Sequence, residues 1–149
     1  MTGVPQLDPG LSNVLFAVWL VSRAVNATID GAISDTGLDA DEFAVYSVLA
    51  QGEGMTPTDL SRWMTAPGTT VSSYVKRFEQ RGHVERQEHP DDGRSYLIQL
   101  TADGREAHRA AGARFLPLLA NVNRVLGPDV NDVHQRLTQL HAAVTTPTT

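Results

Sequence analysis

Hydroxyl and basic side chains gather on one face of a segment in the middle of the chain. At helical spacing, residues 67–81 place an apolar set on one side: Val71, Tyr74, Val75 and Phe78. The opposite side carries a polar set: Thr69, Thr70, Ser72, Ser73, Lys76 and Arg77. Short hydroxyl groups let a helix approach a DNA groove and bond to phosphates or base edges, and cations bind the backbone. A merely solvated face would usually carry more Glu and Lys, because Ser and Thr are mediocre helix formers. The segment therefore predicts a DNA-contacting helix.

A second candidate contact lies in the charged turn that follows. Alternating apolar residues at 96, 98 and 100 predict a strand, and the turn formers at 89–93 join it to the stretch 84–88 as a β-hairpin. Arg94 at the tip could enter a minor groove, where negative potential favours a cation. Asp92 is expected to hold the Arg94 side chain by a charge-assisted hydrogen bond. An ordinary charged turn is the competing interpretation.

The distribution of charge supports nucleic-acid binding better than the total does. The chain has 149 residues and a formal charge of −5, yet between residues 60 and 86 five basic side chains stand against two acidic ones. Hydrophobic residues make up 41%, which is typical of a globular chain, and the length suits one domain, 1–149. The chain has no cysteine, which excludes disulfides, thiolate metal sites and thiol redox sensing.

The elements that would position these residues are mostly helices. Apolar spacing predicts helices at 11–34, from about 39 to 52, at 57–64, 67–81, 102–126 and 130–144. Thr56 and Thr101 are the expected N-caps of the third and fifth. Two short helices joined by a tight turn and followed by a hairpin form a winged helix-turn-helix, here 39–100. The fold class is therefore expected to be mainly α (α+β).

The long helices at both ends exceed what so small a module needs for its own core. The seam at 130–144 suits packing on another helix. The apolar stretch Val14–Val25 is interrupted by Ser22 and Arg23, so it is expected to be too short and too polar to span a bilayer. Residues 1–10 suggest a loose leader and lack the basic region of a signal peptide. We therefore expect a cytoplasmic protein with no membrane partner.

The stretch TPTDLSRWMTAPGTTVSSYVKRFEQRGHVERQEHPDDGRSYLIQLTADG resembles the core of the MarR family (multiple antibiotic resistance regulators). Matching features are the TTVSSYVKRFEQRG helix, the VER after it, the DGR of the wing and the LTADG that opens the next helix. The resemblance implies a homodimer built from 11–34 and 102–145, with 67–81 in the major groove and Arg94 in the minor groove. It also implies a pseudo-palindromic operator in double-stranded DNA and transcription regulation, by default repression. His83 departs from the family, which usually has Leu before the first wing strand. The wing carries few basic residues, which predicts a shallow salt dependence.

The resemblance also raises the question of a small-molecule effector. Many family members release DNA when a phenolic or lipophilic compound binds between the dimer helices and the winged domain. The candidate lining residues are Phe16, Trp19, Phe43, Tyr46 and Trp63. Simple core packing is the favoured alternative for each of them, because aromatic residues at helical spacing usually pack.

Enzymatic and metal-dependent functions find no support in the sequence. It contains no Gly-rich phosphate loop after a strand, no nucleophile elbow and no metal-binding helix motif. His134 and His141 lie seven apart and could meet only across an interface, so we expect no metal, no cofactor and no catalytic residue. The remaining rival is a winged-helix module that binds another protein and has lost DNA, which the acidic net charge favours.

Overall fold

The computed structural model describes residues 13–147 and contains six α-helices and one antiparallel hairpin within them. The helices are α1 (Val14–Ile33), α2 (Ala40–Ala50), α3 (Pro57–Met64), α4 (Gly68–Gln80), α5 (Ala102–Leu126) and α6 (Val130–Thr145). The strands are β1 (Val84–His89) and β2 (Asp92–Leu100), and 3-10 turns lie at Ser34–Thr36 and Gly127–Asp129. The predicted element order is confirmed. The expectations for a leader at 1–10 and a helix start at 11 lie outside the described residues.

Local signals set the helix boundaries. Asn13 caps α1, accepting from the backbone N–H of Phe16 (3.0 Å). The predicted caps of α3 and α5 are confirmed, because the hydroxyls of Thr56 and Thr101 accept from backbone N–H groups three residues on (both 3.1 Å). Side-chain caps satisfy amide donors that a helix cannot pair internally.

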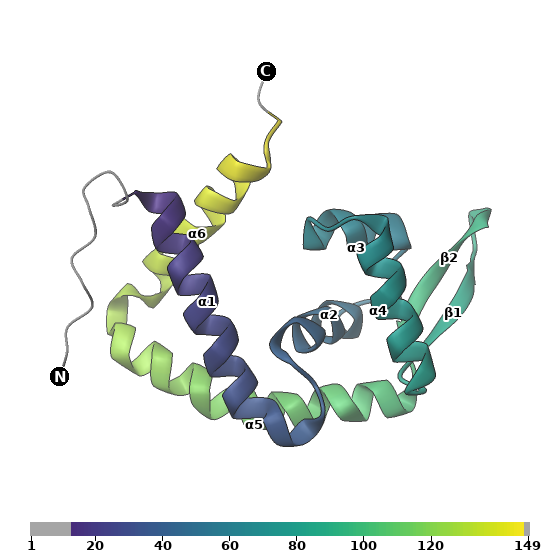
Figure 1. Ribbon diagram of the computed structural model, residues 1–149, viewed down its shortest axis with the longest axis horizontal. Coiled ribbons are helices and arrows are strands. Elements are labelled where there is room, and N and C mark those ends of the chain that lie inside the picture. Colours follow the sequence, from purple (N-terminus) through teal and green to yellow (C-terminus); the bar gives the residue numbers. More distant parts are fainter. Residues whose placement is uncertain (1–12, 148–149) are drawn as a thin grey trace.

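The chain forms a winged helix-turn-helix lobe and a separate set of long helices (Figure 1). Helices α2, α3 and α4 and the hairpin make the lobe, and α5 runs beneath it to meet α1 and α6. The strands pair from Val84 with Leu100 to Glu88 with Tyr96. Met55 adds a bridge to Ile98, and their two backbone hydrogen bonds (2.8 and 3.2 Å) join the segment before α3 to the hairpin.

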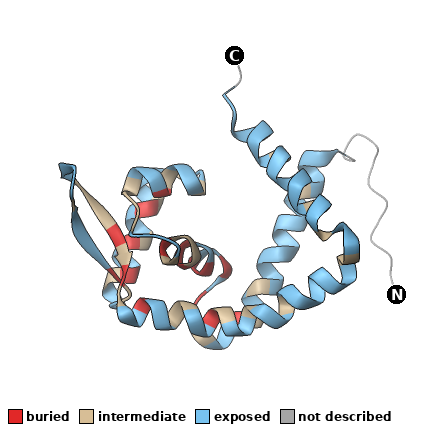
Figure 2. Ribbon diagram, turned by 180° about the vertical axis from the view of Figure 1, so that it is seen from behind, coloured by how far each residue is buried: buried red, intermediate tan, exposed pale blue. Residues whose placement is uncertain are grey.

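The hydrophobic core lies almost entirely in the lobe, as Figure 2 shows by its concentration of buried residues there. The largest fully buried side chains are Tyr46, Phe78, Ile33, Leu49, Leu60, Ile98, Val45, Val71 and Val75. Backbone contact closes the lobe against α5, since a Cβ added at Gly104 would overlap the carbonyl oxygen of His83.

The long helices leave large apolar side chains exposed within this single chain. Trp19 is 59% exposed, Leu116 61% and Val125 72%. By length and composition alone, the longer segment Val14–Thr36 could cross a membrane, although the shorter apolar run Val14–Val25 was expected to be too short and too polar. The helix continues to Ile33, beyond the apolar run considered. Within this chain α1 contacts α2 and α5, and of its residues only Ile33 at the C-terminal end is buried.

Candidate nucleic-acid interface

Helix α4 presents the predicted polar face to solvent. Val71, Val75 and Phe78 are each 1% exposed and anchor the helix in the core. Thr69, Ser72, Ser73, Lys76 and Arg77 are exposed, and Thr70 is half-buried. The N-cap, Pro67, offers no side-chain acceptor to the first-turn amides. Unpaired amides at a helix N-terminus favour phosphate oxygens.

The turn before α4 fixes where the helix begins. Thr65 ends α3 in the left-handed conformation (φ 51°), and its N–H donates to the carbonyl of Arg62 (3.2 Å). The Ser61 hydroxyl donates to the carbonyl of Ala66 (2.5 Å), and the Ala66 N–H returns a bond to Ser61 (3.0 Å). This closed turn joins the two helices of the helix-turn-helix.

The hairpin projects from the lobe beside α4 (Figure 1), with Arg94 exposed near its tip. Asp92 does not play the role expected of it. Its carboxylate accepts from the backbone N–H of Arg94 (2.9 Å), a contact two residues apart that is common in turns, and no ion pair joins it to the guanidinium in the described structure. The residue therefore shapes the turn and leaves the Arg94 side chain free.

A buried carboxylate, missed from the sequence, holds α4 against α2. Glu42 is 3% exposed. Its Oε1 accepts from the N–H of Asp39 (3.1 Å), completing a capping box. Its Oε2 accepts from Nη1 of Arg77 (3.0 Å) and from Nη2 of Arg81 (2.8 Å). Burial on its own would raise the pKa of Glu42, but these three hydrogen bonds outweigh it and hold the pKa below its ordinary value. Arg77 is thus a partly structural residue rather than the freely available cation that the sequence predicted.

Two further contacts extend this network toward the wing. The Tyr46 hydroxyl lies 2.8 Å from Nδ1 of His83, and Arg81 donates to the same hydroxyl (3.5 Å). Burial raises the pKa of Tyr46. Because Tyr46 lies at 0% exposure in the core, it packs and hydrogen-bonds as a structural residue. His83, which replaces the Leu usual in the family that the chain resembles, is thus hydrogen-bonded to the hydroxyl of Tyr46.

The first wing strand is tied to α4 by an arginine. Arg86 of β1 donates from Nε and Nη2 to Glu79 (2.9–3.2 Å), and its guanidinium lies 4.6 Å from the centre of the Tyr96 ring. An arginine held by a carboxylate and an aromatic ring has restricted motion. Wing and helix therefore present one joint surface.

The five aromatic candidates for effector binding are spread over different surroundings. Phe43 is buried and lies against the rings of His108 and Phe115 (5.5 and 5.3 Å), which agrees with core packing. Phe16 and Trp19 are exposed on α1. Trp19 lines a cavity of about 490 Å³ between α1 and α6, and Trp63 lines a different one.

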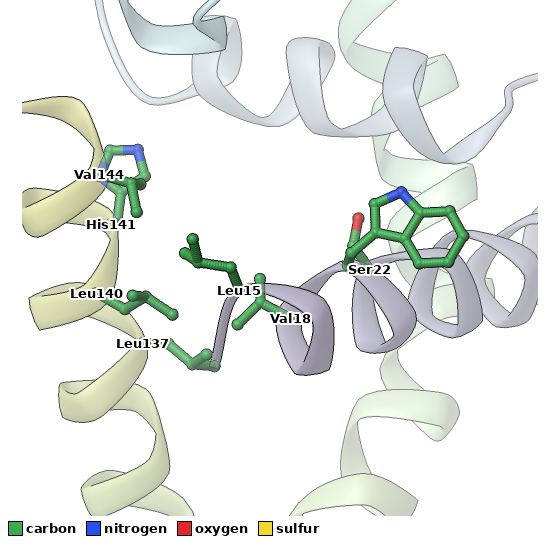
Figure 3. Close-up of a pocket in the computed structure, with 8 residues that line it drawn as sticks. Leu15, Val18, Ser22, Leu137, Leu140, His141 and Val144 are labelled. Atoms are coloured by element: carbon green, nitrogen blue, oxygen red, sulfur yellow. The ribbon is translucent and has the colours of Figure 1, made fainter. Parts of the chain in front are cut away.

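Figure 3 shows the α1–α6 cavity, where Leu15 and Val18 face Leu137, Leu140 and Val144. Another cavity, of about 340 Å³, lies between α1 and α5 and is apolar apart from Thr28. No group of three or more His, Cys, Asp or Glu side chains with metal-binding geometry occurs in residues 13–147.

Comparison with known proteins finds similarity to one family of regulators. The MarR family model matches residues 36–95. The repressor Rv2887 of Mycobacterium tuberculosis is 29% identical over 106 residues, which is 71% of this chain and 74% of that protein. CouR from Rhodococcus jostii bound to p-coumaroyl-CoA superposes with a TM-score of 0.76 at 25% identity, covering 95% of this chain and 99% of that one. A mutant MarR from E. coli with operator DNA superposes with a TM-score of 0.78 at 19% identity over 90% and 99%.

Proposed function

We propose that this chain is a homodimeric transcription regulator of the MarR family that binds a pseudo-palindromic operator in double-stranded DNA. The observation that carries this proposal is the exposed hydroxyl and basic face of α4, held beside the wing by Glu42 and Arg86. A related repressor and a DNA-bound structure of the same fold support it. We also propose that the protein is cytoplasmic and that it is not an enzyme.

We assign the contacts within one half-site as follows. The 39–100 core binds the DNA. Helix α4 enters the major groove, where Thr69, Thr70, Ser72 and Ser73 meet base edges and phosphates. Lys76 contacts the backbone, and the free Arg94 side chain reaches into the minor groove. Arg77 is paired with Glu42 and is thereby withheld from the phosphates, and Asp92 sets the turn.

The dimer is formed by α1, α5 and α6, within 11–34 and 102–145. Apolar side chains on these helices lie exposed in the single chain, among them Trp19 and Val125. Exposed apolar surface of this extent marks an interaction site. A second copy covers it symmetrically, and the two α4 helices then face successive major grooves about one helical turn apart.

The regulator acts as a repressor that a small phenolic or lipophilic compound releases. The supporting observation is the apolar cavity between α1 and α5, with Thr28 as its polar group, and the support by analogy is the bound p-coumaroyl-CoA in CouR. None of the predicted aromatic residues lines this cavity: Phe16, Trp19, Phe43, Tyr46 and Trp63 all lie outside it. Its lining includes Val21, Val25, Phe115 and Leu118, which we propose contact the compound.

Fluorescence anisotropy with a duplex selected from a randomised palindromic pool tests the proposal. Arg94→Ala should weaken the selected duplex by about 1–3 kcal/mol, and Lys76→Ala should weaken all sequences and reduce the salt slope. Arg109→Ala, which removes an exposed cation from α5, is the matched control and should change neither. If no sequence is enriched and binding stays weak at low salt, the DNA proposal is refuted and the protein-binding alternative replaces it.

A further inference from the structure

A groove of about 380 Å³ opens between α2, α3 and α4, on the DNA-binding lobe and apart from the α1–α5 and α1–α6 cavities. Its lining consists of Asp41, Ala44 and Val45 from α2, Trp63 and Met64 from α3, and Thr70 and Tyr74 from α4. The proposed DNA contacts do not use Asp41, Trp63 or Tyr74. The groove therefore has a composition that the operator does not explain.

Two aromatic rings, those of Trp63 and Tyr74, are part of the lining. Leu60, which is 1% exposed, anchors α3 in the core, whereas Trp63 of the same helix is 47% exposed. Tyr74 is half-buried and packs on Phe78, with ring centres 5.6 Å apart. The faces of tryptophan and tyrosine rings attract cations, and a desolvated cation gains the most.

One carboxylate in this groove lacks a cationic partner. Asp30 accepts from the N–H of Ala40 (2.6 Å), Asp39 accepts from that of Glu42 (2.7 Å), and Glu42 holds two arginines. Asp41 is exposed and forms no ion pair within residues 13–147. Partial desolvation and, after it, the nearby charges of Asp39, Asp30 and Glu42 raise the pKa of Asp41. These three neighbouring carboxylates contribute a negative potential around it.

A cation beside the groove is already paired. The Arg77 guanidinium lies 5.2 Å from the centre of the Tyr74 ring, but its charge is paired with Glu42. A ligand in the groove thus meets two aromatic rings, the Met64 thioether and an unpaired carboxylate. Charge complementarity excludes an anion as the preferred occupant.

We propose that this groove binds a small organic cation that carries an aromatic or aliphatic body, with the charge beside Asp41 and the body against Trp63 and Tyr74. This proposal on binding does not depend on DNA recognition. Its consequence for regulation rests on the proposed function: Thr70 and Tyr74 belong to α4, so an occupant covers a proposed DNA contact and weakens operator binding. By linkage, the operator then weakens the cation to the same degree.

Titration with benzyltriethylammonium, followed by NMR of the indole N–H groups, tests the binding directly and without DNA. The chain has two tryptophans, and Trp63→Phe assigns their signals. The expected result is saturable movement of the Trp63 signal, while the Trp19 signal on α1 stays in place. Benzenesulfonate, an anion with the same ring, should move neither.

The matched pair Asp41→Asn and Asp59→Asn separates the carboxylate from general acidity, because Asp59 lies in the first turn of α3 and outside the groove lining. Asp41→Asn should raise the dissociation constant about three- to fivefold, the range of a partly exposed ion pair. Asp59→Asn should leave it unchanged, and circular dichroism confirms that both variants fold. An unmoved Trp63 signal, equal affinity of the two variants, or equal binding of benzenesulfonate would each overturn the proposal.

Discussion

Replacing Glu42 by glutamine should loosen the attachment of the DNA-contacting helix while leaving its shape unchanged. The substitution removes the charge that accepts from Arg77 and Arg81, yet a neutral oxygen can still accept from Asp39 and keep the capping box. The Arg81 contact is the better shielded, with that side chain 29% exposed against 47% for Arg77. We assign about 1.5 kcal/mol to it as a charged hydrogen bond and about 0.5 kcal/mol to the Arg77 contact as a surface pair.

The resulting loss of about 2 kcal/mol corresponds to a fall in Tm of about 4–8 °C for a chain of this size. Thermal unfolding at pH 7, followed by circular dichroism, measures it, and all variants must be compared at one protomer concentration because a dimer's Tm depends on concentration. Glu106→Gln, which breaks a solvent-exposed pair with Arg109, is the matched control and should not shift Tm measurably. If both variants melt together, the buried carboxylate contributes no more than an exposed one and the reasoning fails.

Three further predictions concern the pH dependence of the Glu42 contacts, the packing of α5 and the dimer interface. The pKa of Glu42 is lower in the folded than in the unfolded chain, so the ionised carboxylate contributes its full stabilisation above the ordinary pKa of 4.5 and loses it as the pH falls below that value. The Tm difference between wild type and Glu42→Gln should therefore shrink from pH 6 to pH 3. Gly104→Ala should destabilise the fold by several kcal/mol in urea unfolding, since its methyl group would overlap the His83 carbonyl, whereas Gly112→Ala, with open space around it, should stabilise α5 by about 0.5–1 kcal/mol. Leu137 on α6 is 47% exposed in the single chain, and Leu137→Asp should shift sedimentation toward the monomer, with a roughly hundredfold weaker dimer, because two-fold symmetry would place the charge in the proposed interface twice. An unchanged sedimentation coefficient at low concentration would contradict the proposed interface.

Helix boundaries could be predicted from the sequence because their determinants are local. Thr56 and Thr101 cap helices through amides three residues away, and Gly82 takes the left-handed conformation (φ 75°) after α4. Each of these signals acts within one turn of chain. The order of elements followed from them and is confirmed.

The attachment of α4 could not be predicted in the same way. Glu42 precedes Arg77 by 35 residues and Arg81 by 39, and nothing local joins them. The capping-box spacing of Asp39 and Glu42 identifies a helix start, but it does not indicate that the second carboxylate oxygen is turned toward α4. Asp92 was mispredicted for a different, local reason: two donors of Arg94 lie within its reach, and in the turn the carboxylate accepts from the backbone N–H rather than from the guanidinium.

This pairing changes how the local positive charge should be counted. Three of the five basic residues between 60 and 86 hold carboxylates: Arg77 and Arg81 hold Glu42, and Arg86 holds Glu79. Within residues 13–147, Arg62 and Lys76 of that segment form no ion pair, and neither does Arg94 in the wing.

Three available cations per protomer limit the number of counterions that a dimer can release. At a slope of about −0.9 per phosphate contact, log K against log salt should fall with a slope near −5 for wild type. Glu42→Gln should steepen it, because Arg77 is then free to meet a phosphate, and non-specific affinity should rise with it. A slope that stays the same in the variant would mean that Arg77 contacts phosphate while paired with Glu42. The carboxylate would then orient this arginine toward DNA rather than withhold it.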